Sequence, residues 1–151
     1  MAITKGRAFG RTHTVAAYRS GLEAKIAEQL EAAGLPVAFE QYKLKYVVPE
    51  REATYTPDFL LRNGIVIESK GIFDVDDRKK HLLIHEQHPE LDIRFVFSSS
   101  RAKIYKGSKT TYADWCNKHG FQFADKLIPA SWLKEPVRVI PEGTLIPKGV
   151  T

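Results

Sequence analysis

Several features that would assign other protein classes are missing from this chain of 151 residues. Its single cysteine, Cys116, cannot form an internal disulfide, which favours a reducing cytoplasm, and we interpret it as a small apolar helix residue rather than a nucleophile. No apolar run approaches the roughly 18 residues of a membrane-spanning helix. Residues 1–10 lack the apolar core of a signal peptide. We find no internal repeat, and we predict one compact domain without membrane contact.

Acidic residues are absent from two stretches of the chain. Residues 1–22 and residues 101–109 each contain four cations and no acid, and residues 78–80 form a third basic group. The net charge is +5, and the pI is about 9.3. Any one patch fits solvated surface charge, but three together favour nucleic acid, because neutralised phosphates release condensed counterions. The candidate DNA contacts are Arg7, Arg11, Arg19, Arg78, Lys79, Lys80, Arg101, Lys103 and Lys106.

Hydrophobic periodicity divides the chain into a helix, three consecutive strands, and then further helices and a strand. Apolar residues recur at helical spacing after Ser20, and Gly34 supplies a stop. Thr111, with Asp114 three residues later, marks another helix start, and Gly120 marks its end. The predicted elements are a helix at 20–33, a strand at 37–48 with an irregularity near residue 41, a connector at 49–53, strands at 55–61 and 65–70, a helix from 76 or 77 to 88, a strand at 92–97, a helix at 111–118 and a turn at 131–133.

The order of these elements predicts an α/β fold. The strand, helix and strand between residues 65 and 97 require parallel pairing through a right-handed crossover, so the central sheet should be mixed and flanked by helices. We expect residues 1–19 to be a flexible basic arm and residues 20–135 to form the folded domain. Residues 136–151 are rich in Pro and Gly, and we expect a loosely held tail.

The residues that carry chemistry lie on two of the predicted strands. Glu68 and Lys70 point to the same face, because strand side chains alternate. The position of Asp58 depends on the hairpin register. A two-residue loop sets Asp58 opposite Ser69, whereas a three-residue loop with Gly64 in the left-handed conformation sets it opposite Glu68. We predict the second register with a cation between the two carboxylates, because they otherwise repel.

Paired carboxylates of this kind suit a hard metal ion. Carboxylate oxygens and waters are the ligands that Mg²⁺ prefers, and we expect Mn²⁺ to substitute. The ion would lower the pKa of a bound water and offset charge that builds on a phosphate. Lys70 would orient that water, or act as a base if the cation depresses its pKa. A lone Glu-x-Lys is usually a solvated strand face, so the interpretation depends on Asp58, Glu68 and Lys70 occurring together.

Pro57-Asp58 followed by Glu68-Ser69-Lys70 resembles the PD-(D/E)xK nuclease signature. The predicted element order is also similar to the core of that fold. The chain resembles still more closely the phage endonuclease I family of Holliday-junction resolvases, over roughly residues 15–135. The segments that carry this likeness are residues 18–23, 55–61, 76–84, 86–94, 96–101, 105–108 and 123–130.

The resemblance implies a restriction-endonuclease-like core in an intertwined, domain-swapped homodimer. The connector, at about residues 47–53, would pass between two lobes, so that Glu23 of one subunit completes the site of the other. The implied activity is Mg²⁺-dependent hydrolysis of four-way junctions and other branched DNA, leaving 5′-phosphates, in the cytoplasm of the infected bacterial host. The residues that the resemblance assigns are the metal ligands Asp58, Glu68, Glu23 and the backbone carbonyl of Ser69, and the signature lysine Lys70.

Other interpretations follow from the residues alone. Ser20 and Glu23 match a helix capping box, in which the glutamate accepts a backbone N–H instead of binding metal. His81, His85 and His88 are spaced i, i+4 and i+7, but we expect phosphate contact or a plain surface rather than zinc. The chain as a whole could be a non-catalytic DNA-binding module, which would not need clustered carboxylates. It could also be a restriction-type nuclease that reads duplex sequence, which would need further recognition elements.

Overall fold

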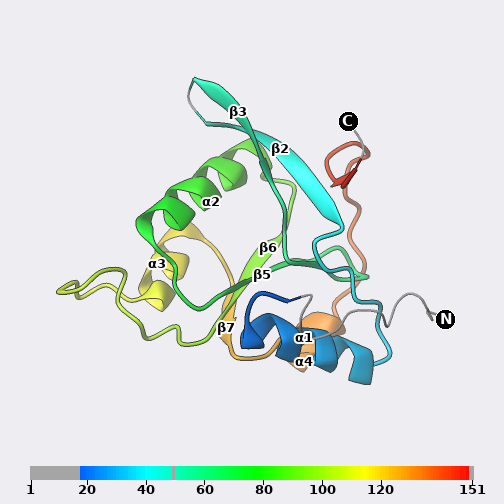
Figure 1. Ribbon diagram of the computed structural model, residues 1–151, viewed down its shortest axis with the longest axis horizontal. Coiled ribbons are helices and arrows are strands. Elements are labelled where there is room, and N and C mark those ends of the chain that lie inside the picture. Colours follow the sequence, from blue (N-terminus) through cyan, green and yellow to red (C-terminus); the bar gives the residue numbers. More distant parts are fainter. Residues whose placement is uncertain (1–17, 49, 150–151) are drawn as a thin grey trace.

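Two sheets bordered by helices make up the part of the chain that the computed structural model describes, residues 18–48 and 50–149 (Figure 1). The larger sheet has the strand order β4-β5-β6-β7, and the smaller one has the order β3-β2-β8. Among these residues no helix has the length and apolar character needed to cross a membrane. The elements are α1 (Gly21–Ala32), β2 (Tyr42–Val48), β3 (Arg51–Tyr55), β4 (Phe59–Leu60), β5 (Val66–Lys70), α2 (Val75–Gln87), β6 (Ile93–Phe97), α3 (Tyr112–His119), β7 (Phe123–Asp125), α4 (Ala130–Leu133) and β8 (Ile146–Pro147).

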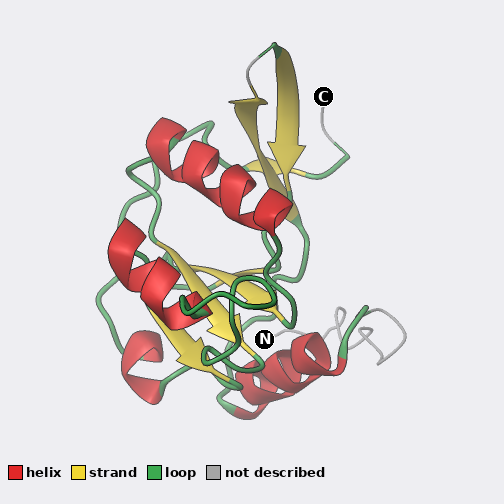
Figure 2. Cartoon of the chain, turned by 90° about the vertical axis from the view of Figure 1, so that its left-hand side faces the viewer, coloured by secondary structure: helices red, strands yellow, loops and turns green. Residues whose placement is uncertain are grey.

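The larger sheet is mixed and flanked by helices, which confirms the predicted α/β class. β4 runs antiparallel to β5, whereas β5, β6 and β7 run parallel to one another. Side chains alternate along β6, so that Val96 packs on the α1 side with Ile26, and Phe95 packs on the α3 side with Trp115. Figures 1 and 2 show the helices on both sides of this sheet. The sequence did not reveal β7, because three residues are too few to display an alternation.

The β4–β5 hairpin has the three-residue loop that the sequence predicts. Phe59 lies opposite Ile67, and the N–H of Leu61 donates to the carbonyl of Ile65 at 2.8 Å. Gly64 has a φ of 91°, and a Cβ atom at this position would lie 2.8 Å from Cγ of Arg138. The same register sets Asp58 opposite Glu68. The prediction of two carboxylates side by side is therefore confirmed.

The predicted long strand at 37–48 is wrong, because its two halves belong to different sheets. Phe39 forms an isolated bridge with Phe59 beside β4, while β2 starts at Tyr42 and pairs with β3. Glu40, between them, has a φ of 50°, where the chain leaves one sheet for the other. The predicted strand at 55–61 is divided in the same way between β3 and β4.

Most of the predicted connector at 49–53 is strand. β2 and β3 form an antiparallel hairpin, in which Val48 lies opposite Arg51 and Val47 lies opposite Glu52. Glu50 has a φ of 78° at the turn, and Pro49 lies outside the described residues. The hairpin projects from the body of the protein (Figures 1 and 2). The side chain of Gln87 joins it to α2, since it bonds both the N–H and the carbonyl of Val47.

The C-terminal segment through residue 149 is hydrogen-bonded to the rest of the fold, whereas we expected a loosely held tail. β8 pairs with β2, and the N–H of Arg138 donates to the carbonyl of Asn63 at 3.0 Å. Arg94, only 2% exposed, binds Glu135 with both terminal nitrogens, and the Arg138 guanidinium binds Asp92. These partners are distant in the sequence, so composition alone could not indicate them.

The helices α2 and α3 both begin at capping boxes. α3 has the predicted Thr111 cap and the predicted stop at Gly120. The cap of α2 lies two or three residues earlier than predicted, because Asp74 is the cap and Asp77 is its reciprocal partner. Cys116 is buried in α3, as expected of an apolar helix residue.

Candidate active site

Asp58 and Glu68 face each other across the β4–β5 hairpin, and both are almost fully buried. Oδ2 of Asp58 accepts hydrogen bonds from the N–H and the hydroxyl of Ser69, at 2.9 and 2.7 Å. Oε1 of Glu68 accepts from the hydroxyl of Tyr55 at 2.6 Å and from the N–H of Asp58 at 3.3 Å. Each carboxylate thus has one oxygen held by the protein.

Burial sets the electrostatics of this pair. It raises the pKa of Asp58 to about 6, with a further contribution from the charge of Glu23 and an opposing one from the hydrogen bonds of Ser69. Burial and then the negative charge of Asp58 raise the pKa of Glu68 to about 8. Because simultaneous ionisation of these two carboxyl groups is unfavourable, the pair forms a site where binding of a cation is strongly favoured.

Lys70 lies at the end of β5 on the same side as Glu68, as strand alternation predicts. Its Nζ is 3.1 Å from Oδ1 of Asp77 and 3.5 Å from Oε2 of Glu68. Burial lowers the pKa of Lys70, but the charges of Glu68 and Asp77 outweigh that effect, and the net result is a raised pKa. The surroundings thus favour the protonated ammonium, which orients a reactant, over the neutral base that we considered as the alternative.

The side chain of Glu23 accepts a backbone N–H at the start of α1, but from Arg19 rather than from Ser20, so the predicted capping box is only half formed. Ser20 caps α1 by accepting from the N–H of Glu23 at 3.1 Å, and Oε1 of Glu23 accepts from the N–H of Arg19 at 2.8 Å. Carboxylate oxygens of Glu23, Glu40 and Asp58 also lie within 4.8 Å of one another, close enough to hold one metal ion. In this structure Glu23 therefore lies beside Asp58 of its own chain.

Sequence reasoning missed three residues at this site. Glu40 carries no motif, and only the irregularity that we predicted near residue 41 marked its neighbourhood. Tyr55 looked like an ordinary strand residue, although it lies three positions before Asp58. Asp77 was considered only as a possible helix cap, yet its carboxylate both completes the α2 capping box and binds Lys70.

The predicted DNA contacts divide into several groups. Arg7 and Arg11 lie outside the described residues. Arg78 is buried and donates to the carbonyls of Phe73 and Ile104, at 2.6 and 3.1 Å, so its prediction as a DNA contact is wrong. Arg19 is exposed but forms an ion pair with Glu40. The remaining candidates are the half-buried Lys80 and the exposed Lys79, Arg101, Lys103 and Lys106.

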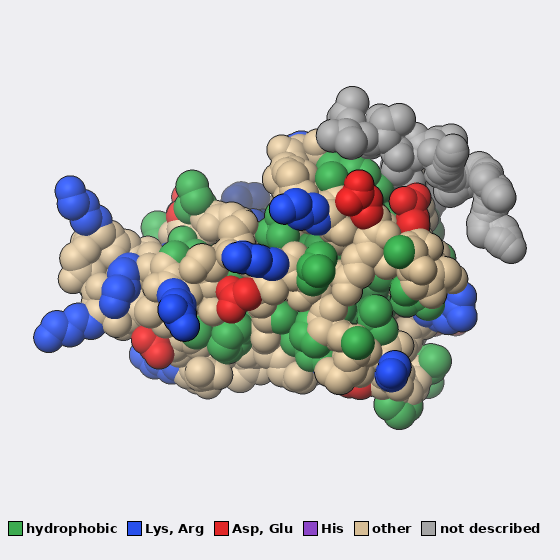
Figure 3. Space-filling view, turned by 90° about the horizontal axis from the view of Figure 1, so that it is seen from below, with side chains coloured by type: hydrophobic (Ala, Val, Ile, Leu, Met, Phe, Trp, Pro, Cys, Tyr) green, Lys and Arg blue, Asp and Glu red, His purple; other side chains and the backbone are tan. Residues whose placement is uncertain are grey.

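Several of these cations belong to the loop between β6 and α3. Lys and Arg side chains gather toward the left end of the face in Figure 3, where Figure 1 draws that loop. The loop starts next to the carboxylate pair, because the N–H of Ser98 donates to the carbonyl of Lys70 at 3.0 Å. A polyanion bound along the loop would therefore extend toward Lys70.

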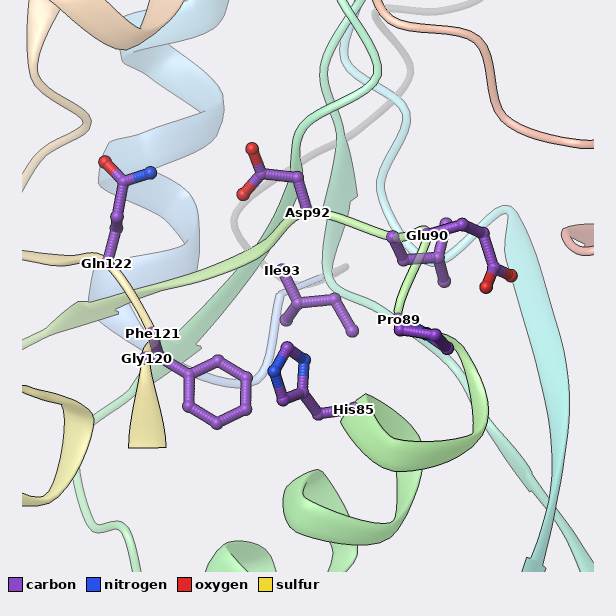
Figure 4. Close-up of a pocket in the computed structure, with 9 residues that line it drawn as sticks. His85, Pro89, Glu90, Asp92, Ile93, Gly120, Phe121 and Gln122 are labelled. Atoms are coloured by element: carbon purple, nitrogen blue, oxygen red, sulfur yellow. The ribbon is translucent and has the colours of Figure 1, made fainter. Parts of the chain in front are cut away.

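His81 and His85 of α2, and His88 at its C-cap, have separate surroundings, and the metal-ligating group found among the described residues includes none of them. His81 is fully buried against the rings of Tyr55 and Phe95, which corrects our expectation of a surface position. Nε2 of His88 lies 2.6 Å from the carbonyl oxygen of Lys45. His85 packs against Phe121 in a depression of about 260 Å³ near the start of β6, at the end opposite Lys70 (Figure 4).

Comparison with known proteins assigns the family. The family model described as "Phage endonuclease I" matches residues 1–151. This chain belongs to the phage endonuclease I family. Endonuclease I of Escherichia phage T7 is 61% identical over 135 residues, which cover 89% of this chain and 91% of the T7 protein. Endodeoxyribonuclease 1 of Enterobacteria phage T3 is 59% identical over 138 residues, covering 91% of this chain and 85% of the T3 protein.

Membership in the phage endonuclease I family agrees with the resemblance carried by the signature residues. Identities this high extend along nearly the whole of each chain, so the similarity is not restricted to the Asp58 and Glu68 hairpin. The buried carboxylate pair and the adjacent Lys70 are thus features of a chain whose relatives are named as nucleases.

Proposed function

We propose that this phage endonuclease I family member is a divalent-metal-dependent DNA endonuclease that cuts four-way junctions and other branched DNA, leaving 5′-phosphates. The observation that carries the proposal is the burial of Asp58 and Glu68 side by side, with Lys70 next to them. We further propose that the β4–β7 sheet with its helices is a restriction-endonuclease-like core. The relatives come from phages, which supports action within the infected bacterial cell, in its cytoplasm as predicted.

The donor set fits Mg²⁺, and Mn²⁺ would be accepted by the same oxygens. Asp58, Glu68 and the backbone carbonyl of Ser69 would hold the ion, with Glu23 as a further ligand. The raised pKa values of Asp58 and Glu68 support this assignment, because a cation between the two groups removes the cost of ionising both. When bound, the ion would supply Lewis acidity and a water of lowered pKa.

The residues of the chain would place the reactants around that ion. The ammonium of Lys70 would donate a hydrogen bond to the attacking water or to an oxygen of the scissile phosphate. Asp77 would keep that ammonium protonated and in position. The loop cations Arg101, Lys103 and Lys106 would bind backbone phosphates beside the cut, which gives affinity without reading base sequence.

A cleavage assay tests this function. We expect Mg²⁺-dependent cutting of a labelled four-way junction at least about tenfold faster than cutting of a matched linear duplex, a difference of ~1.4 kcal/mol in activation free energy. Reactions in EDTA serve as the control. Binding without cutting of either DNA would favour the non-catalytic module, and equal cutting of both would favour a duplex nuclease.

We also propose a domain-swapped homodimer in which the site is shared. Along the chain, the β2–β3 hairpin connects the segment that carries Glu23 to the strands that carry the rest of the site. The turn of this hairpin includes Glu50, which has a φ of 78°. If this hairpin opens, the same contacts between Glu23 and Asp58 form between two chains instead of within one. Each half of such a dimer would then have the same arrangement of elements as the single chain, with the Glu23 segment supplied by the partner chain.

Mixed dimers distinguish a shared site from a site within one chain. A heterodimer of Glu23→Gln and Lys70→Ala chains has one intact site if Glu23 crosses to the partner, and none if it does not. We expect such heterodimers, purified with two tags, to nick a cruciform-bearing supercoiled plasmid at about half the wild-type rate per dimer. Each variant homodimer is the control, and nicking no faster than theirs would refute the exchange.

A further inference from the structure

We infer that Tyr55 is a positioning residue for Glu68, holding one oxygen of the carboxylate so that the other is presented to a divalent ion. The inference rests on the proposed metal-dependent function. It assigns a specific task to a side chain that carries no part of the nuclease signature. Tyr55 ends β3, whereas Glu68 belongs to β5, so the contact joins the smaller sheet to the larger one.

The geometry divides the two oxygens of Glu68 between different tasks. Oε1 accepts the 2.6 Å hydrogen bond from the hydroxyl of Tyr55 and a longer one from the N–H of Asp58. Oε2 is 3.5 Å from Nζ of Lys70, on the side where the reaction would take place. Tyr55 thereby fixes the rotation of the carboxylate, and Glu68 would offer a single oxygen to the ion.

The ring of Tyr55 is itself held from several sides. It is 2% exposed and lies opposite Leu44 in the β2–β3 ladder. The ring of His81 packs edge-on at a centroid distance of 5.0 Å, and the ammonium of Lys80 lies 5.3 Å from the ring centroid. Because both of these partners belong to α2, the helix after β5 keeps the hydroxyl aimed at Glu68.

Tyr55→Phe tests the inference, because it removes the hydroxyl and retains the packed ring. Groups that orient a metal ligand typically contribute about 10–100-fold to metal affinity. We therefore expect the full-length variant to bind Mn²⁺ at least about tenfold more weakly in a titration followed by electron paramagnetic resonance. The Mg²⁺ concentration for half-maximal junction cleavage should rise by a similar factor, and the rate should recover largely at saturating Mg²⁺.

Tyr112→Phe is the matched control. Tyr112 is 6% exposed, and its hydroxyl accepts the N–H of Phe73 at 3.1 Å, so the change also removes one buried hydrogen bond. We expect both variants to melt at similar temperatures, with weakened Mn²⁺ binding in Tyr55→Phe alone. Mn²⁺ affinity in Tyr55→Phe within twofold of wild type, or equal weakening in both variants, would overturn the inference. Absence of Mn²⁺ binding in the wild type would instead overturn the proposed function and this inference with it.

Discussion

Replacing Lys70 with alanine is expected to slow junction cleavage by about 10³-fold while junction affinity stays within about threefold of wild type. The Lys70 ammonium lies between Glu68 and Asp77, and it would stabilise charge only as the phosphate reacts. A single partly buried cation among several basic groups contributes little to ground-state binding. Single-turnover cleavage and junction titration by fluorescence anisotropy in Ca²⁺ measure the two quantities separately.

Lys118→Ala is the matched control for Lys70→Ala. Lys118 lies exposed on α3, and we have assigned it no DNA contact. Its removal should change neither rate nor affinity by more than about threefold. A Lys70→Ala protein that cleaves at near the wild-type rate would remove Lys70 from the proposed mechanism. One that cuts slowly and has also lost junction binding would indicate a structural role instead.

Glu68→Gln is expected to abolish metal-dependent cleavage and, at the same time, to stabilise the metal-free protein at alkaline pH. Burial raises the pKa of Glu68 from 4.5 to about 8, so the folded state holds this proton more tightly than the unfolded state does. The resulting stabilisation is fully present below pH 4.5 and is lost as the pH rises through 8. Glutamine keeps an oxygen for the Tyr55 hydroxyl but has no proton to lose.

The ionisation of Glu68 can be measured separately between pH 6 and pH 8. The pKa of Asp58 is raised only to about 6, so Asp58 ionises below this pH window. In EDTA, the unfolding free energy of wild type relative to Glu68→Gln should fall by roughly 1 kcal/mol per pH unit across that window. Urea denaturation at one fixed protein concentration measures it. Glu52→Gln, a substitution at an exposed position of β3, is the control, and its unfolding free energy should change with pH in parallel with that of wild type. If the unfolding free energy of Glu68→Gln also changed with pH in parallel with that of wild type, Glu68 would ionise with an ordinary pKa.

Where local chemistry decides a structure, the sequence was a reliable guide. The α3 caps depend on Thr111, Asp114 and Gly120, which act within one turn of the helix ends. The hairpin register depends on Gly64, which adopts the left-handed conformation that other residues avoid. Strand alternation then placed Glu68 and Lys70 on one face. These steps need no information from distant parts of the chain.

Other features depended on contacts between distant segments. Arg78 has the composition of a DNA contact, but two backbone carbonyls, one of them from Ile104, surround its guanidinium. His81 shares a polar helix with the exposed Lys79, yet it packs between aromatic rings. The tail is rich in Pro and Gly, yet Arg138 binds it to Asp92 and to the carbonyl of Asn63. Neither burial nor a distant partner leaves a periodic signal in one sequence.

The carboxylate cluster combines both kinds of information. The sequence by itself determined the side on which Lys70 lies, because a strand has a period of two. It also predicted the pairing of Asp58 with Glu68, because of the two loop lengths considered only the three-residue loop sets the carboxylates across from each other, where a cation can bind both. Only the tertiary structure brought Glu23 and Glu40 to Asp58, Tyr55 to Glu68 and Asp77 to Lys70. The reason is physical, since each of these contacts joins elements that meet only when the sheets and helices pack.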